Sequence, residues 1–198
     1  QREHSSCGVG FVASLTNQAS HDTLNLGLKA LVNLEHRGGT SPDGRMGDGA
    51  GVLTDIPREL LGLAEGDALA NLFLPSDLTS QVRALRIFED TFRTMGLDVY
   101  HYRQVPICQE VLPEAHRASR PGFLMAFIRR PEQCTSRYGF EKMLYSAKQL
   151  TRSRLRETGI VKQFFFTSLS AATVVYKALL PSDKLALFYP DLQDPRYK

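Results

Sequence analysis

The chain has 198 residues, of which 42 % are hydrophobic and 23 % are charged, as is usual for a globular core. Its 24 basic and 21 acidic residues give a formal net charge of +3, a balance that argues against nucleic acid or an anionic membrane as a partner. No apolar run approaches the roughly 20 residues of a membrane span. Three cysteines without a CxxC pair argue against a disulfide framework or a metal site, so we expect reduced thiols and a cytoplasmic protein.

The first predicted elements are a strand and a helix. The apolar run from Gly8 to Leu15 has the pattern of a strand buried on both faces, and Cys7 stands at its entrance. Leucines at helical spacing then predict a helix over residues 23–36, for which Ser20 or Asp22 can serve as the N-terminal cap.

A glycine-rich segment follows this helix. Gly38 to Gly51 combines several glycines with Pro42, a density that predicts a tight, shaped loop rather than a regular element. The segment from Val52 to Ile56 reads as a second strand, and Pro57 is placed to begin a short helix.

Helices and strands alternate through the rest of the chain. The expected elements are a strand at 72–74, a helix from Ser76-Asp77 to Gly96, strands at 97–105 and 123–128, a helix at 138–157, a strand pair at 161–169 and 171–177 around Ser170, and a short helix at 182–189. We interpret residues 67–130 as an inserted or peripheral α+β layer. The sequence contains no internal repeat and no clear linker between independent domains.

Cys7 is the candidate nucleophile. If cleavage makes it the first residue, its own α-amine can accept the thiol proton, because such an amine titrates near pH ~7.7 to 8.0 whereas an amide nitrogen cannot act as a base. The alternative is that Cys7 is a small apolar residue that begins a core strand, since free cysteine is among the most buried residue types.

Arg37 is the candidate binding residue. It lies in His36-Arg37-Gly38 at a helix end, where a cationic side chain commonly compensates the helix dipole. Alternatively, its guanidinium turns into a pocket and holds a substrate carboxylate through a bidentate pair.

The glycine-rich segment also has two interpretations. It lacks the Lys-Ser/Thr of a phosphate-binding loop, and Gly47 to Gly51 precedes a strand rather than a helix, so nucleotide binding is disfavoured. A structural turn and a substrate-facing loop both remain compatible with its composition.

Three segments in this order resemble the start of the glutamine amidotransferase domain of the glutamate synthase large subunit. They are Cys7-Gly8-Val9-Gly10-Phe11, Leu34-Glu35-His36-Arg37-Gly38-Gly39 and Gly47-Asp48-Gly49-Ala50-Gly51. Two later segments, Phe164 to Lys177 and Phe188-Tyr189-Pro190-Asp191-Leu192, agree with it. The resemblance covers nearly the whole chain and is weakest over residues 67–160.

This resemblance implies an α+β fold, namely an αββα sandwich of the N-terminal nucleophile hydrolase type that is incomplete at its C-terminal side. Cys7 matches the nucleophile that attacks the side-chain amide of L-glutamine, which yields ammonia and glutamate. Arg37 matches the arginine of the family's His-Arg-Gly segment and is carried over as a substrate-binding residue. No metal is implied at this site.

In the family the ammonia passes to a synthase domain of the same polypeptide, which uses FMN and an iron-sulfur cluster. We expect no cofactor in these 198 residues. The electron donor and any oligomeric assembly are left open by the sequence.

Residues 1–6 precede the candidate nucleophile and are polar, so we expect them to be a propeptide or leader, with residues 7–198 forming the N-terminal part of the amidotransferase domain. The family places its carboxylate-binding arginine and its oxyanion-hole Asn-Gly pair after the position of Lys198. Because one oxyanion donor is worth ~10² to 10³ in rate, we expect weak or no activity from this chain alone. The alternative is a non-catalytic amidotransferase-like binding domain.

Overall fold

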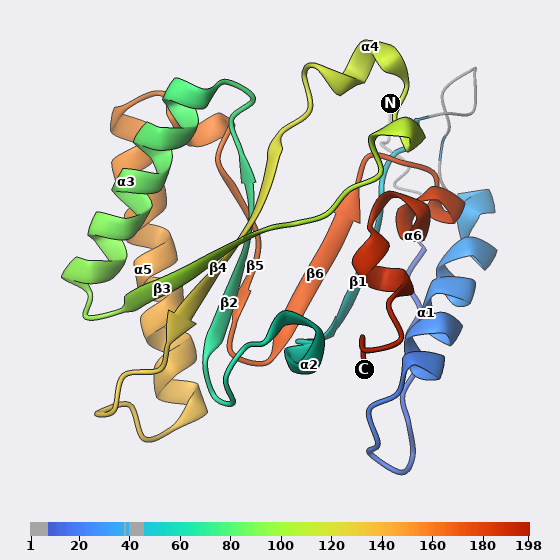
Figure 1. Cartoon of the computed structure of the whole chain (residues 1–198), viewed down its shortest axis with the longest axis horizontal. Helices are drawn as coiled ribbons and strands as arrows, with labels where there is room; N and C mark the ends of the chain where they lie inside the picture. Colours follow the sequence, from blue (N-terminus) through green and yellow to red (C-terminus); the bar gives the residue numbers. More distant parts are fainter. Residues whose placement is uncertain (1–7, 38, 40–45) are drawn as a thin grey trace, which may run out of the picture. The chain divides into compact units, whose positions relative to one another are not determined.

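The computed structural model describes residues 8–37, 39 and 46–198, apart from the side chains of Arg37 and Val161. It combines helices with antiparallel strands, which confirms the α+β class (Figure 1). The chain divides into two compact units: unit 1 comprises Gln1–Leu61, Pro106–Arg117 and Tyr176–Lys198, and unit 2 comprises Gly62–Val105 and Ala118–Val175. Unit 2 overlaps the expected layer at 67–130 with different bounds, and the peripheral role of that layer stays a prediction.

Unit 2 is built on a four-stranded antiparallel sheet with the order β3-β4-β2-β5. Its elements are β2 (Ala68–Leu74), α3 (Leu78–Thr94), β3 (Asp98–Gln104), β4 (Gly122–Arg129), α5 (Arg137–Glu157) and β5 (Phe165–Ser170). The chain order βαββαβ, with the first and third strands at the centre, is the split βαβ arrangement.

The central strand β2 begins four residues before the strand expected at 72–74. It pairs with β4 on one side and β5 on the other, and nearly all of its residues are buried. A strand covered on both faces needs no alternation of polar and apolar residues, which explains why Ala68 and Ala70 gave no strand pattern.

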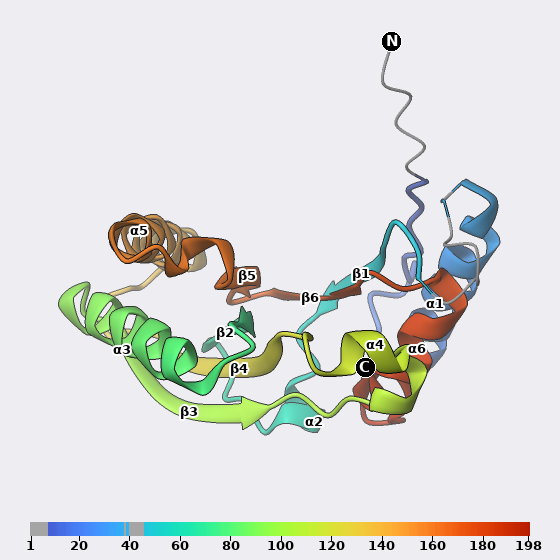
Figure 2. The ribbon, with the colours of Figure 1, turned by 90° about the horizontal axis from the view of Figure 1, so that it is seen from above.

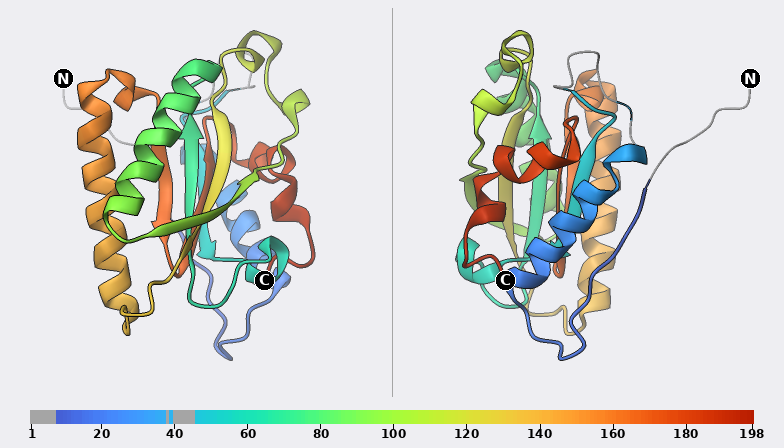
Figure 3. Two further views of the ribbon diagram at one scale, coloured as in Figure 1. Left: turned by 60° about the vertical axis from the view of Figure 1, so that its left-hand side comes forward. Right: turned by 90° about the vertical axis from the view of Figure 1, so that its right-hand side faces the viewer.

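Helices α3 and α5 lie side by side on one face of this sheet (Figures 2 and 3). Their N-terminal caps are Asp77, which accepts from the Ser80 amide, and Ser136, which accepts from the Gly139 amide. Phe88 of α3 is fully buried and its ring lies near those of Phe92, Phe164 and Phe166, so aromatic packing joins helix and sheet.

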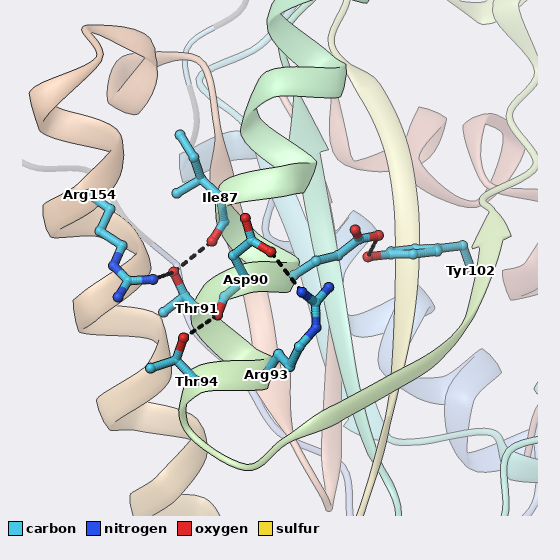
Figure 4. A network of polar contacts seen from close by, with 8 residues as sticks. Ile87, Asp90, Thr91, Arg93, Thr94, Tyr102 and Arg154 are labelled. Carbon is cyan, nitrogen blue, oxygen red and sulfur yellow. Dashed lines mark hydrogen bonds and ion pairs between the residues drawn. The ribbon is translucent and has the colours of Figure 1, made fainter.

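A polar bridge links the two helices through the buried Thr91 (Figure 4). The Thr91 hydroxyl donates to the carbonyl of Ile87 at 2.6 Å and accepts from Arg154 Nη1 at 3.1 Å. On the same helix, Asp90 forms an ion pair with Arg93 at 3.1 Å. Thr91 and Asp90 are thus bonded to other residues of unit 2. We therefore interpret them as structural residues and not as candidates for a functional site.

Unit 1 contains short helices around one pair of strands. Its elements are α1 (His21–Asn33), β1 (Ala50–Asp55), α2 (Arg58–Leu61), α4 (Glu114–Arg117) and α6 (Leu185–Phe188), with short 3-10 helices at Glu35–Arg37, Gln109–Val111, Ser182–Lys184 and Pro190–Gln193. Strand β1 pairs with β6 (Thr173–Ala178), whose residues from Tyr176 onward belong to this unit. Ser20 caps α1 by accepting from the Thr23 amide, as one of the two expected caps.

Strands β5 and β6 are present near the expected positions, but the expected pairing between them is wrong. They belong to different sheets, because β5 pairs with β2 and β6 pairs with β1. Side chains of two strands bond to β6 instead: the amide of Val175 donates to Ser168 Oγ of β5 at 3.1 Å, and the carbonyl of Val175 accepts from Asn71 Nδ2 of β2 at 2.9 Å. No helix in the described part of the chain is long and apolar enough to cross a membrane.

Candidate active site

The candidate site lies where the three motif segments of unit 1 come together. The first contact is between the segment after Cys7 and the end of α1: a Cβ placed on Gly10 would lie 3.8 Å from Leu34 Cδ1. Leu34 itself is the C-terminal cap of α1. The segment that follows the candidate nucleophile therefore passes beside the segment that carries Arg37.

Arg37 is placed directly after α1 by a single 3-10 turn, Glu35–Arg37. The ring of His36 stabilises the preceding helix end, since its Nδ1 lies 3.0 Å from the carbonyl oxygen of Asn33. A ring N–H of His36 at this position satisfies a carbonyl at the helix end, so the capping role expected of the His36-Arg37-Gly38 segment falls to His36. The side chain of Arg37 lies outside the described residues, so its assignment to a pocket stays a prediction.

Gly39 and Asp48 close the glycine-rich loop. The amide of Gly39 donates to Asp48 Oδ2 at 2.8 Å, and the amide of Asp48 donates to the carbonyl of Gly39 at 3.0 Å. Two hydrogen bonds between the same two residues, one of them to a carboxylate, define the geometry of the loop ends. Asp48 is not among the site residues predicted from the sequence; its position between two glycines in Gly47-Asp48-Gly49 was the available signal.

The glycines on both sides of Asp48 allow a close approach between two backbone segments. A Cβ on Gly47 would lie 3.1 Å from the backbone nitrogen of Pro181, and one on Gly51 would lie 3.0 Å from Lys177 Cβ. Gly49 has φ +118°, which other residues rarely adopt. The expected tight, shaped loop is confirmed at this end. Glycine is favoured at positions 47 and 51 because a larger residue would crowd the neighbouring segment.

Cys7 lies outside the described residues, and the structure begins at the glycine that follows it. The strand expected from Gly8 to Leu15 is wrong for this structure: these residues form no strand, and Val9 and Phe11 are 92 % and 94 % exposed. An apolar run becomes a strand only when a neighbouring strand satisfies its backbone groups. None of the strands in the described part of the chain pairs with this run.

Buried tyrosines support the site from within unit 1. Tyr176 donates to Asp191 Oδ2 at 2.8 Å, Tyr189 donates to the carbonyl of Lys177 at 2.8 Å, and Tyr197 lies 2.7 Å from Thr54 Oγ1. Burial raises the pKa of Tyr189 and of Tyr197 above the usual range. These hydroxyls join β1, β6 and the C-terminal helices, so they support the strands beside the glycine-rich segment.

The two cysteines of the described residues do not form a metal or cluster site. The thiol of Cys108 donates to Glu110 Oε2 at 3.2 Å and that of Cys134 lies 3.6 Å from the carbonyl oxygen of Ser136, and they belong to different units. An iron-sulfur cluster requires several cysteine thiolates together. Residues 8–37, 39 and 46–198 contain no group of three His, Cys, Asp or Glu side chains suited to a metal ion.

Comparison with known proteins gives the class of this chain. The family model for class-II glutamine amidotransferases matches residues 7–198. The chain belongs to this family.

Its relatives include named glutamate synthases. The chain is 35 % identical to ferredoxin-dependent glutamate synthase 2 of Arabidopsis thaliana over 99 % of its own length and 13 % of the relative's. It is 35 % identical to ferredoxin-dependent glutamate synthase 2 of Synechocystis, over 98 % of the chain and 13 % of the relative. It is 30 % identical to the glutamate synthase [NADPH] large chain of Azospirillum brasilense, over 99 % of the chain and 14 % of the relative. The chain thus spans about an eighth of these relatives.

Proposed function

We propose that this chain is the glutamine-hydrolysing domain of a glutamate synthase, with Cys7 as the nucleophile and Arg37 in the glutamine pocket. The observation that carries the proposal is the family match, which starts at Cys7 and extends to Lys198. The contacts from Gly10 to Leu34 and from Gly39 to Asp48 support it, because they bring the segments that flank Cys7 and Arg37 together.

The reaction starts with the transfer of the Cys7 thiol proton to the α-amine of the same residue. The sulfur forms a bond to the side-chain amide carbon of glutamine, and the C–N bond breaks as the proton passes to the leaving ammonia. Water then attacks the thioester, releases glutamate and restores the thiol. Arg37 contributes as a residue of the glutamine pocket rather than as a group that takes part in the bond changes.

The base in this reaction exists only when Cys7 is the first residue. We therefore assign residues 1–6 as a leader that is removed before the enzyme acts. The family match supports this assignment because it excludes these six residues.

The αββα sandwich requires more strands than β1 and β6 provide. Leu53 of β1 is 65 % exposed. Two strands alone are marginally stable, and a third with a hydrophobic face adds stability. We infer that this sheet gains further strands in the full-length protein.

We assign use of the ammonia to a separate synthase domain of the same polypeptide, where FMN and an iron-sulfur cluster would carry electrons from an external donor. We place both groups in that domain because the resemblance to the glutamate synthase large subunit gives them to it. The relatives are named as ferredoxin-dependent and NADPH enzymes, which supports a redox partner for the whole protein. A cytoplasmic location stays a prediction, since some relatives are named as chloroplastic.

Ammonia release from L-glutamine by the full-length protein tests this function. Cys7→Ala should abolish release, whereas Cys108→Ala, which removes a half-buried thiol of the same unit, should retain it. Equal release by Cys7→Ala and the unmodified protein would contradict the assignment. If the unmodified protein binds glutamine without releasing ammonia, the domain is instead the non-catalytic binding module.

A further inference from the structure

The hydrogen bonds between Gly39 and Asp48 connect the segment that follows α1 with the segment that precedes β1. Gly39 stands two residues after Arg37, which is the last residue of the 3-10 turn that follows α1. Asp48 stands two residues before β1. The bonds of 2.8 Å and 3.0 Å between them therefore tie the Arg37 turn to the strand pair β1 and β6.

The Asp48 side of this link packs closely against a second segment. Gly47 and Gly51 flank Asp48, and a Cβ on either would approach the backbone or Cβ atoms of residues 176–181 to between 3.0 and 3.2 Å. The glycines thus let residues 47–51 lie close against the backbone of residues 176–181. Asp48 stands in this segment, and from there its carboxylate reaches the Gly39 amide.

The Gly39 side is shaped to accept the carboxylate. A Cβ on Gly39 would lie 2.9 Å from Asp48 Oδ2 and 3.3 Å from Asp48 Cγ. Any side chain at position 39 would therefore displace the carboxylate from the amide. Glycine at 39 and aspartate at 48 form a matched pair, in which the absence of one side chain makes room for the other.

We propose that Asp48 is a positioning residue for glutamine binding: its carboxylate holds the turn that carries Arg37 in the orientation that the substrate requires. This inference rests on the proposed function, because Arg37 is its link to the substrate. Asp48 acts through the Gly39 amide and the short turn, as a positioning group. Loss of the carboxylate releases the turn and weakens glutamine binding more than it slows the chemical step.

Variants of the full-length protein separate this role from general damage. Asp48→Ala removes the acceptor, Asp48→Asn keeps a side-chain oxygen that can accept from Gly39, and Asp55→Ala removes an exposed carboxylate at the end of β1 as the matched control. The readouts are KM and kcat for glutamine-dependent ammonia release. A further readout is the rate at which iodoacetamide alkylates Cys7, followed by peptide mass spectrometry with and without glutamine.

Asp48→Ala should raise the KM, and the glutamine concentration that half-protects Cys7, by about tenfold, with kcat changed less than about threefold. Asp48→Asn should recover most of this loss, and Asp55→Ala should match the unmodified protein. Alkylation without glutamine should be the same in all of them, because iodoacetamide needs no pocket.

An unchanged KM in Asp48→Ala, or a slower alkylation of Cys7 in parallel with a higher KM, would overturn the inference. Cys7→Ala distinguishes failure of the positioning role from failure of the proposed function. If it is inactive and Asp48→Ala binds glutamine normally, only the positioning role fails. If Cys7→Ala still hydrolyses glutamine, the proposed function fails and the inference fails with it.

Discussion

The hydroxyl of Tyr176 donates a 2.8 Å hydrogen bond to the carboxylate of Asp191, and both side chains are buried in unit 1. Tyr176 lies on β6, and Asp191 lies in the last 3-10 helix. This bond therefore fastens the C-terminal segment to the strand pair that supports the glycine-rich loop. The same bond gives Asp191, in the segment Phe188-Tyr189-Pro190-Asp191-Leu192, a structural role.

Tyr176→Phe should lower the free energy of unfolding by about 1.5 to 3 kcal/mol, because a hydrogen bond to a buried charged acceptor is lost while the ring is kept. Urea denaturation measures the change. Tyr145→Phe, on the exposed side of α5, removes a hydroxyl of the same kind and should change the free energy by less than about 0.5 kcal/mol. Equal effects of the two substitutions would show that the bond to Asp191 does not stabilise the fold.

Alkaline pH should destabilise unit 1 through its buried tyrosines. Burial raises the pKa of Tyr189 and Tyr197 in the folded protein, so the folded state keeps their protons at a pH where the unfolded chain loses them. Their contribution is fully present below the unfolded pKa of about 10 and is lost as the pH rises from there through the folded pKa.

The free energy of unfolding should therefore fall above about pH 10, with a limiting slope of about 1.4 kcal/mol per pH unit for each tyrosine. Urea denaturation at about pH 8 and about pH 11 measures this fall. Tyr197→Phe should show a smaller fall than the unmodified protein. The same fall in both proteins would be evidence against this cause.

Two glycine substitutions should have opposite signs. Gly51→Ala places a Cβ 3.0 Å from Lys177 Cβ and 3.2 Å from the carbonyl oxygen of Tyr176, and should destabilise by about 1 to 3 kcal/mol through overpacking. Gly27→Ala, inside α1, meets nothing within 4 Å and should stabilise by about 0.5 to 1 kcal/mol, since alanine favours a helix. Thermal unfolding of both variants tests the close approach of β1 and β6, and a stabilising Gly51→Ala would refute it.

Much of unit 2 could be predicted from the sequence because its signals are local. The helical spacing of apolar residues gave α3 and α5 nearly their observed bounds, and Ser76-Asp77 marked the start of α3. The partner of β6 could not be predicted in the same way. Strands adjacent in sequence usually pair, and here Ser168 and Asn71 side chains take the bonds that a hairpin would give to backbone groups.

The candidate site was predicted only in part, since its geometry depends on contacts between distant residues. The glycine-rich segment indicated a tight loop, but nothing local showed that Asp48 bonds to Gly39. The run from Gly8 to Leu15 indicated a buried strand from apolarity alone, although burial also requires a partner strand. Cys7 and Arg37 came from resemblance and stay predictions.

The central claim is that Cys7 becomes the first residue and attacks glutamine. Mass spectrometry of the full-length protein after incubation with a diazoketone analogue of glutamine tests it most directly, because such an analogue alkylates the thiol that attacks it. The account predicts an N-terminal peptide that begins at Cys7 and carries one adduct on that residue, which excess glutamine prevents. A protein that hydrolyses glutamine while residues 1–6 remain attached, or while Cys7 stays unmodified, would contradict it.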